Sequence, residues 1–461
     1  MSASSNVTSG FIDLATFDEI EKYMYGGPDA TAYFVRETRK STWFTQVPVA
    51  LSKASGSPAF GTDWSVSISR AGDYLLQTWL RLTTPEVTLT SASSVTSTQG
   101  VHRHLRWTRN LMHNIIKECN ITFNDLVAAR FDNYHLDFWA AFTVPASKRN
   151  GYDNMIGNVS DLTDPHSAGV KIPSYTLNLP LPFFYGRDSG VALPTAALPY
   201  NEMRINFTFR DFNELLIISY DDETTNSVPA VATDLVGGQA PTLSAAVWAN
   251  YAIVSNDERK RMACAPRDIL IEQVQTAPRS SYDPVRSSTT FDIRFSHAIR
   301  VLFFAVRNTS CKAEWSVYST SSPTVASGPV IMFYPDGAAD PILQTSLIYE
   351  NTNRLTAMGS DYFSLVNPWF HAPTIPDVIG FHSYSYSLDF MALDPMGSTN
   401  YGKLTNVSIV PEASQAAKDA AAGTGGVGSG YAVAQTFEFV VTCINNNIIR
   451  VSGGALGFPV L

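Results

Sequence analysis

The chain has 461 residues, of which 45% are apolar and only 16% are charged, a composition typical of a globular protein. Its length exceeds one ordinary core but fits two all-β sandwiches of about 200–250 residues each. The 32 basic and 41 acidic residues give a formal net charge of −9. A protein that binds nucleic acid needs a basic surface to neutralise phosphates, so we expect no direct contact with nucleic acid.

No segment of the sequence predicts secretion or a membrane span. The first residues, MSASSNVTSGFIDLA, lack the basic and apolar regions of a signal peptide, and no run of 18 apolar residues occurs. The cysteines are far apart, and no pair has the spacing of metal ligands. Such sparse use of Cys119, Cys264, Cys311 and Cys443 is typical of folding in a reducing compartment, so we expect the chain to fold in the cytosol.

The first predicted element is a short helix. Thr16 and Glu19 have the spacing of a capping box, and a following Gly-Gly-Pro sequence would end the helix. Phe17, Ile20 and Met24 fall at i, i+3 and i+7 and form one apolar stripe. A helix this short is marginal alone, so the stripe must dock. The stripe contacts either the chain's own body, or a membrane surface or partner protein.

After this helix, apolar and polar residues alternate with period two, which is typical of β-strands. Trp64, Val66 and Ile68 alternate with serines, and the same pattern recurs along 205–209 and 247–253. A second set of strands begins at Ile269. It comprises 271–274, 291–295, 299–306, 384–390, 404–410 and 437–444. Many short strands separated by Pro- and Gly-rich turns favour sandwiches over βαβ units, so the pattern predicts two all-β halves.

The two halves meet at the charged run 257–261, which can form one short helical turn. This run is either a solvated linker or a domain hinge, and its place between two sets of strands favours the hinge. We therefore expect three parts: an N-terminal arm over 1–30, a first sandwich over 31–258 and a second over 259–461.

Four segments read as long loops, a common place for surface function. Three are polar insertions, at 85–100, 221–241 and 319–341, and the Ala/Gly-rich segment 413–430 reads as a flexible loop. The last contains a formal GxGxxG at 423–428. No βαβ context surrounds it, so it does not indicate a dinucleotide site.

No arrangement of residues predicts catalysis or metal binding, because GxSxG, HExxH and Cys/His zinc patterns do not occur. His102 and His104 are two apart but have no acidic neighbour in the sequence. Asp132, His135 and Asp137 could orient a general base, yet the aromatic residues around them favour a packed structural histidine. We expect no catalytic residue, no cofactor and no metal site.

Long stretches of the sequence resemble the major capsid proteins of iridoviruses, closest to the branch that infects invertebrates and within the large nucleocytoplasmic DNA viruses. The resemblance covers nearly the whole chain and is specific because its motifs are long. In the first half they are NVTSGFIDLATFDEIEKYMYGG (6–27), RWTRNLMHNII (106–116), ITFNDLVAARFDNYHLDFWAAFTVPASKRNGYDNMIGN (121–158) and LPLPFFYGRDSGVALPTAALPYNEMRINF (179–207). In the second half they are DERKRMACAPRDILIEQVQ (257–275), DIRFSHAIRVLFF (292–304), YENTNRLTAMGSDYFSLVNPW (349–369) and LDPMGSTNYGKLTN (393–406).

The resemblance implies two tandem eight-stranded jelly rolls and a structural role in the virion, with no enzymatic activity. It implies that three copies form a pseudo-hexagonal capsomer, and that capsomers tile an icosahedral shell assembled in the host cytoplasm over an internal membrane. The implied partners are further copies of the chain, minor capsid proteins and penton proteins. The N-terminal segment would lie on the inner side, which favours membrane or minor-capsid contact for Phe17, Ile20 and Met24.

The resemblance also suggests roles for individual residues. Asp257, Glu258, Arg259 and Arg261 would hold the two sandwiches at a fixed angle through paired charges. A turn motif found in related capsid proteins corresponds to Gly397, Ser398 and Asn400, where glycine permits a positive φ and the small polar side chains cap the backbone.

Two other classes of protein fit an all-β chain: a lectin-like jelly roll, which would carry a calcium cluster, and a glycosidase, which needs two facing carboxylates. The sequence has no tight acidic cluster, but facing carboxylates are a property of the folded chain.

Overall fold

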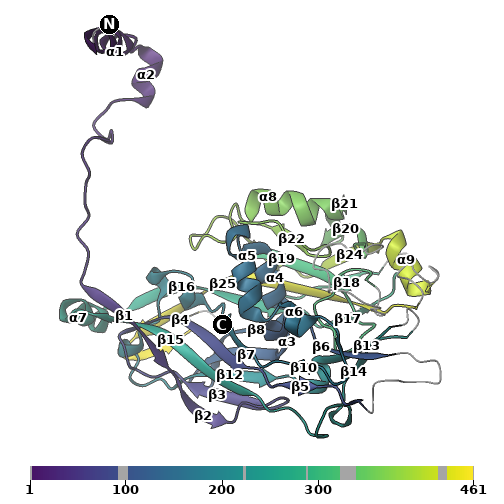
Figure 1. Ribbon diagram of the computed structural model, residues 1–461. Helices are drawn as coiled ribbons and strands as arrows, with labels where there is room; N and C mark the ends of the chain where they lie inside the picture. Colours follow the sequence, from purple (N-terminus) through teal and green to yellow (C-terminus); the bar gives the residue numbers. More distant parts are fainter. Residues whose placement is uncertain are drawn as a thin grey trace. The chain divides into compact units, whose positions relative to one another are not determined.

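The computed structural model describes residues 3–91, 102–221, 225–286, 289–321, 339–423 and 433–459, with side chains from residue 6 onward. It divides into an N-terminal segment that ends at Trp43 and a body, Phe44–Leu461 (Figure 1). Each unit is described by itself below.

The N-terminal segment contains two helices, α1 (Ala3–Ala15) and α2 (Glu19–Met24). Asp18, rather than Thr16, caps α2: its carboxylate accepts from the Glu19 N–H at 2.8 Å, and the Glu21 carboxylate accepts from the Asp18 N–H at 3.3 Å. The expected Thr16–Glu19 box is therefore wrong, because the Thr16 hydroxyl donates to the Asp13 carbonyl at the end of α1. Helix α1 was not predicted, since its Ser-, Thr- and Asn-rich first turns have low helix propensity.

The first half of the body is a sandwich of two antiparallel sheets around one core. Along β12 every second side chain is buried, and Ile205 lies opposite Val66 on one neighbour and Ile121 on the other. Leu80 and Val247 of the facing sheet share this core. One sheet contains, in spatial order, β1 (Phe44–Ala50), β15 (Ser244–Val254), β4 (Tyr74–Thr83) and β11 (Thr176–Pro180). The other contains β2 (Ser52–Gly56), β3 (Asp63–Ser67), β12 (Met203–Phe209), β7 (Ile116–Phe123) and β8 (Leu126–Asp132).

Two smaller sheets complete this half. One pairs β5 (Val87–Thr88) with β10 (Lys171–Ile172). The other contains β14 (Val228–Pro229), β13 (Leu216–Tyr220), β6 (Arg103–Trp107) and β9 (His166–Ser167).

The second half is another sandwich with its own core, which includes Phe304, Leu347, Ile409 and Phe439. Its larger sheet contains β16 (Arg267–Thr276), β25 (Phe437–Ser452), β19 (Ala298–Asn308) and β22 (His382–Ser385), with short strands β17 (Ser280–Tyr282), β23 (Thr399–Asn400) and β26 (Ala455–Gly457) beside them. Its smaller sheet contains β18 (Phe291–Asp292), β24 (Val407–Ala413), β20 (Ile342–Tyr349) and β21 (Thr352–Gly359).

The Ala-rich segment after β24 is partly helical, which corrects the expected flexible loop. Residues Gln415–Ala422 form α9. The Ser414 hydroxyl accepts from the Ala417 N–H at 3.2 Å, and Gly423, with φ of 65°, ends the helix in the left-handed conformation. Residues 424–430 of this segment lie outside the described residues, as do 92–100, 222–224 and 322–338 in the other three insertions, and so does most of the GxGxxG match.

The remaining helices connect or cover the sandwiches. No helix among the described residues is long and apolar enough to cross a membrane. The helices of the body are α3 (Leu111–Asn114), α4 (Asn133–Thr143), α5 (Ala146–Ile156), α6 (Ser160–Thr163), α7 (Asn256–Cys264), the π-helix η7 (Tyr362–Val366) and α8 (Asn367–His371). Short 3₁₀ turns are η2 (Phe184–Gly186), η3 (Ser189–Val191), η4 (Thr195–Ala197), η5 (Phe212–Glu214), η6 (Ala232–Asp234) and η8 (Tyr401–Lys403).

Candidate functional site: the junction between the two sandwiches

Helix α7 joins the two halves in the chain, and one of its predicted charges binds the first half. Arg259 donates from Nε and Nη2 to the two carboxylate oxygens of Asp73, at 2.9 and 3.0 Å. Burial raises the pKa of Asp73, but the hydrogen bonds from Arg259 and from the Val254 N–H outweigh it, so the pKa lies below its usual value. Asp257, Glu258 and Arg261 make no ion pair within the described parts of the chain.

Reversal of the charge at Arg259 is the direct test of its predicted role. In Arg259→Glu, two carboxylates face each other at Asp73, so we expect the yield of assembled trimer to fall several-fold in size-exclusion chromatography. Arg261→Glu makes the same charge change on the same helix without an ion pair to lose, and it serves as the control. Unchanged assembly of Arg259→Glu would refute the role of this residue in holding the junction.

Helix α4 makes an aromatic contact between the halves, since it packs against the larger sheet of the second half (Figure 1). Phe138 and Phe142 of α4 both stack on Phe303 of β19, with ring centroids 5.7 and 5.3 Å apart. Phe381 packs edge-on against both of these α4 rings. The helix therefore belongs to the first half by sequence but packs, in a cluster of its own, against the larger sheet of the second half.

A buried carboxylate on the same helix ties the halves together with hydrogen bonds. The Asp137 side chain is 0% exposed. On the first-half side, its Oδ1 accepts from Asn110 at 3.1 Å and lies 2.8 Å from Nδ1 of His113. On the second-half side, its Oδ2 accepts from the hydroxyls of Ser316 and Tyr318, at 2.9 and 2.8 Å. One carboxylate thus bonds to groups from two separate segments, one in each half.

An ion pair crosses the junction nearby. Arg106 of β6 donates from Nη2 to Glu314 Oε2 at 2.9 Å, and the two side chains are 0% and 10% exposed. Burial raises the pKa of the Glu314 carboxyl, but the charge of Arg106 outweighs it, so the net pKa is lowered. Burial also lowers the pKa of the neighbouring Arg109, to about 10. The carboxylate is therefore held ionised in a buried site by a guanidinium of the other half.

Trp315 lies between two arginines, one from each half. The guanidinium carbons of Arg210 and Arg307 lie 3.5 and 4.1 Å from its ring centroid. Its indole N–H donates to the Glu214 carbonyl of the first half at 2.9 Å. Contacts of a guanidinium with an indole face are the most favourable cation–π pairs, so this residue anchors the second half on the first.

Two further carboxylates extend the polar junction. Glu272 of β16 pairs with both Arg187 of the first half and Arg300 of β19. Glu438 of β25 accepts a hydrogen bond from the hydroxyl of Tyr134, in α4, at 3.0 Å. All of these contacts are largely buried, and buried pairs of this kind fix geometry more than they add stability.

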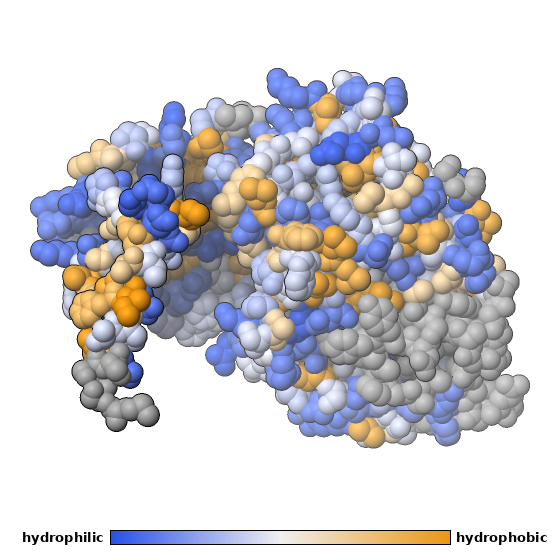
Figure 2. Space-filling model, turned by 90° about the horizontal axis from the view of Figure 1, so that it is seen from above, coloured by the Kyte–Doolittle hydropathy of each residue, from blue (hydrophilic) through white to orange (hydrophobic). Residues whose placement is uncertain are grey.

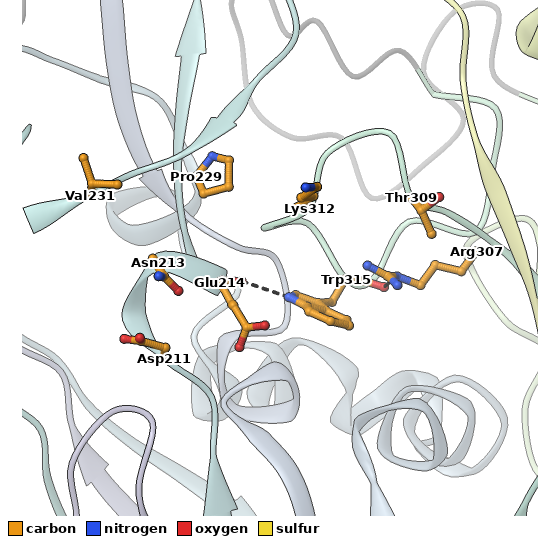
Figure 3. A pocket seen from close by; sticks show the side chains of 9 residues that line it. All are labelled: Asp211, Asn213, Glu214, Pro229, Val231, Arg307, Thr309, Lys312 and Trp315. Atoms are coloured by element: carbon orange, nitrogen blue, oxygen red, sulfur yellow. Dashed lines mark hydrogen bonds between the residues drawn. The ribbon is translucent and has the colours of Figure 1, made fainter. Parts of the chain in front are cut away.

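A hollow of about 690 Å³ opens at the edge of the junction and is lined from both halves (Figure 3). Two acidic residues, Asp211 and Glu214, are among its lining residues. However, Asp211 already caps η5 by accepting from the Phe212 N–H at 2.7 Å. The lining residues are Asp211, Asn213, Glu214, Pro229, Val231, Arg307, Thr309, Lys312 and Trp315.

Of the histidines singled out in the sequence, His104 has an acidic partner and His135 packs among aromatic rings. His104 pairs with Asp221, which is distant in sequence, and no group of three potential metal ligands occurs in the described ranges. Asp132 caps α4 by accepting from the His135 N–H at 3.0 Å, while Asp137 bonds to His113 instead. His135 is buried, and its ring packs against Phe131 and Trp139, with ring centroids 6.4 and 5.8 Å apart.

His135 gives the junction a predicted pH dependence. Burial, helped by the charge of Arg187, lowers its pKa from 6.5 to about 3. The unfolded chain therefore binds a proton at His135 between these pH values while the folded chain does not, and stability falls as pH decreases through this window. As pH decreases from 6.5 to 5, we expect the free energy of unfolding to decline less steeply in His135→Gln than in wild type. The difference in slope is up to about 1.4 kcal/mol per pH unit. Urea unfolding at several pH values measures this, and equal slopes for both proteins would contradict it.

The other predicted residues lie in a turn of the second half and in the N-terminal segment. Gly397 has a φ of 116°, and an added Cβ would lie 2.9 Å from the Tyr386 carbonyl oxygen, so the turn requires glycine. Asn400 caps η8 by accepting from the Gly402 N–H at 3.0 Å, and Ser398 is exposed. The side chains of Phe17, Ile20 and Met24 are 49%, 73% and 67% exposed in the N-terminal segment.

The four cysteines are free thiols. Three of them are buried, and burial raises the pKa of each thiol: Cys119 in β7, Cys443 in β25, and Cys311. Cys264, at the end of α7, is exposed.

Comparison with known proteins places the chain in a family. Residues 32–254 match the family described as the N-terminus of major capsid proteins, and residues 258–457 match the large eukaryotic DNA virus major capsid protein family. The major capsid protein of Costelytra zealandica iridescent virus is 68% identical over 100% of this chain and 99% of its own length. That of Tipula iridescent virus is 67% identical over 98% and 97%.

Solved structures agree on the fold. The chain is similar to VP54 of PBCV-1, with a TM-score of 0.72 and 18% identity over 93% of this chain and 100% of that one. The Faustovirus major capsid protein gives a TM-score of 0.66 at 10% identity, over 92% and 93%. The chain therefore has the double jelly-roll fold, is a structural protein of the virion rather than an enzyme, and belongs to the major capsid proteins of large eukaryotic DNA viruses.

Proposed function

We propose that three copies of this chain form a pseudo-hexagonal capsomer, and that capsomers tile the outer icosahedral shell of a large double-stranded DNA virus. The observation that carries the proposal is the junction built around α4 and Asp137. It holds two similar sandwiches as one body, so a threefold axis would place six of them in a ring. Closed cyclic symmetry of this kind reuses one interface per copy.

Each of the three parts of the chain has its own role in the capsomer. Residues 31–258 and 259–461 form the two jelly rolls, and residues 1–30 form the arm. The arm contacts the inner viral membrane or a minor capsid protein, while neighbouring capsomers and penton proteins meet the body. The formal net charge of −9 supports a shell that does not touch nucleic acid directly, and the free cysteines support assembly in the reducing host cytoplasm.

Mass photometry of the purified full chain tests the trimer. We expect a main species of three times the chain mass of 50.4 kDa. A stable monomer at micromolar concentration would refute self-assembly into capsomers by this chain alone.

Substitution of the apolar stripe tests whether the arm contacts the membrane. Replacement of Phe17, Ile20 and Met24 by serine removes exposed apolar area, and burying such area at an interface is worth about 25 cal/mol per Å². We expect the triple variant to lose most of its co-flotation with liposomes of zwitterionic and anionic lipids, while it still forms trimers. The control replaces Glu19 and Lys22, which form an exposed ion pair on the same helix, by serine. Flotation that is equal for wild type and triple variant would exclude the membrane as the partner of this stripe.

A further inference from the structure

A groove lined mainly by apolar side chains lies on the body, next to the junction. It has a volume of about 570 Å³ and is formed by α4, α5 and the segment that follows β11. Trp139, Met155, Leu181 and Phe183 contribute apolar surface to its walls. Its size and lining are those of sites that hold small molecules, which typically measure about 300–1,000 Å³.

The charged residues that line this groove all have one sign. Lys148 and Arg187 line it, and no aspartate or glutamate does. Lys148 is exposed and makes no ion pair with any residue in the described ranges. The groove therefore offers a positive charge without a neutralising partner at its rim.

Arg187 also lines the groove, but acidic partners offset its charge. Its guanidinium lies 4.6 Å from the ring centroid of Trp139, which lines the groove. It shares the carboxylate of Glu272 with Arg300, and the exposed Asp389 is a second acid whose charge acts on it. Its Nε makes no hydrogen bond within the described part of the chain and remains a free donor.

We propose that this groove binds an amphipathic monoanion of the fatty-acid class. The alkyl chain lies along Trp139, Met155 and Phe183, and the carboxylate accepts from Lys148 and from Arg187. The charge complementarity selects this occupant: an uncharged apolar molecule would fill the walls but leave Lys148 without an anion. Charge-assisted hydrogen bonds to a carboxylate are about twice as strong as neutral ones, so the anion binds more tightly than its alcohol.

The test measures binding of dodecanoate to the purified full chain by isothermal titration calorimetry, below the micellar concentration of the probe. We expect saturation at one dodecanoate per chain and binding about tenfold or more tighter than that of dodecanol. Ligand binding to the folded chain alone also raises its melting temperature, which gives a second readout. Lys148→Glu should weaken dodecanoate by about tenfold or more and leave dodecanol unchanged.

The groove offers a position at which it can be blocked without damage to the fold. Gly151 lines it, and a Cβ added there meets no atom within 4 Å. Gly151→Phe therefore places a ring in the groove without backbone strain and is expected to abolish binding of both probes. Asn150→Phe adds the same ring at the adjacent exposed position, which does not line the groove, and should bind like wild type. If Gly151→Phe does not fold, Met155→Glu replaces it, because this half-exposed side chain lines the same wall.

Dodecanol that binds as tightly as dodecanoate would overturn the proposal, and so would unchanged binding in the folded blocking variant. A groove that binds an acidic apolar peptide but not dodecanoate would be a protein-docking surface, which also refutes it. None of these outcomes bears on trimer formation, so the capsomer proposal stands or falls separately.

Discussion

Replacement of Asp137 by alanine is expected to lower the free energy of unfolding by about 3–5 kcal/mol, a large part of the stability of a protein domain. The carboxylate is fully buried and is the shared acceptor for Asn110, Ser316 and Tyr318, with His113 on its other side. Its removal leaves several buried donors without an acceptor, and each unsatisfied group costs about 1–3 kcal/mol. Urea unfolding followed by circular dichroism measures the loss.

The control for this variant is Asp394→Ala. Asp394 is an exposed aspartate of the second half that makes no hydrogen bond within the described residues. Its replacement should change stability by less than about 0.5 kcal/mol. A loss below about 1 kcal/mol in Asp137→Ala would show that the cluster around this carboxylate does not hold the halves together.

The second large effect is expected at the ion pair between Arg106 and Glu314. Arg106→Met leaves the Glu314 carboxylate buried without its partner, since the two side chains are 0% and 10% exposed. Breaking a buried pair from one side costs about 3–5 kcal/mol, whereas replacing both members by apolar residues is often neutral. We therefore expect the double variant, Arg106→Met with Glu314→Leu, to be more stable than Arg106→Met alone by several kcal/mol.

A double-mutant cycle over wild type, the two single variants and the double variant measures this coupling by urea unfolding. The matched control is the exposed pair of Arg450 and Asp268, whose side chains are 55% and 51% exposed. Exposed pairs contribute little, so its coupling should be below about 1 kcal/mol. If the losses in free energy of unfolding of the two single variants add up to the loss of the double variant, the two charges do not stabilise each other.

The two sandwiches were predictable because the longer strands have a local sequence pattern. Val66, Ile205 and Phe207 alternate with polar residues in the sequence and are buried in the structure, since successive side chains of a strand point to opposite faces. The ends of the elements were less certain. The cap of α2 is Asp18 rather than Thr16, and both residues suit that role by type, so only the backbone geometry decides between them.

The polar junction was not predictable, because its contacts join residues that are far apart in the sequence. Ser316 is 179 residues from Asp137, and Glu314 is 208 residues from Arg106. A local signal was nevertheless present. Arg300 and Arg307 interrupt an otherwise apolar strand, and a charge at such a position needs a buried partner. The sequence directed attention to α7 instead, where of the four predicted residues Arg259 alone forms an ion pair among the described residues.

Electron microscopy of the purified chain tests the central claim most directly, namely that the junction holds two jelly rolls as one body and that three such bodies form a capsomer. We predict class averages with a hexagonal outline and six densities around a threefold axis. Particles with three lobes, or with two densities per chain at variable separation, would contradict the account, because the buried contacts of α4 and Asp137 leave the two sandwiches one arrangement.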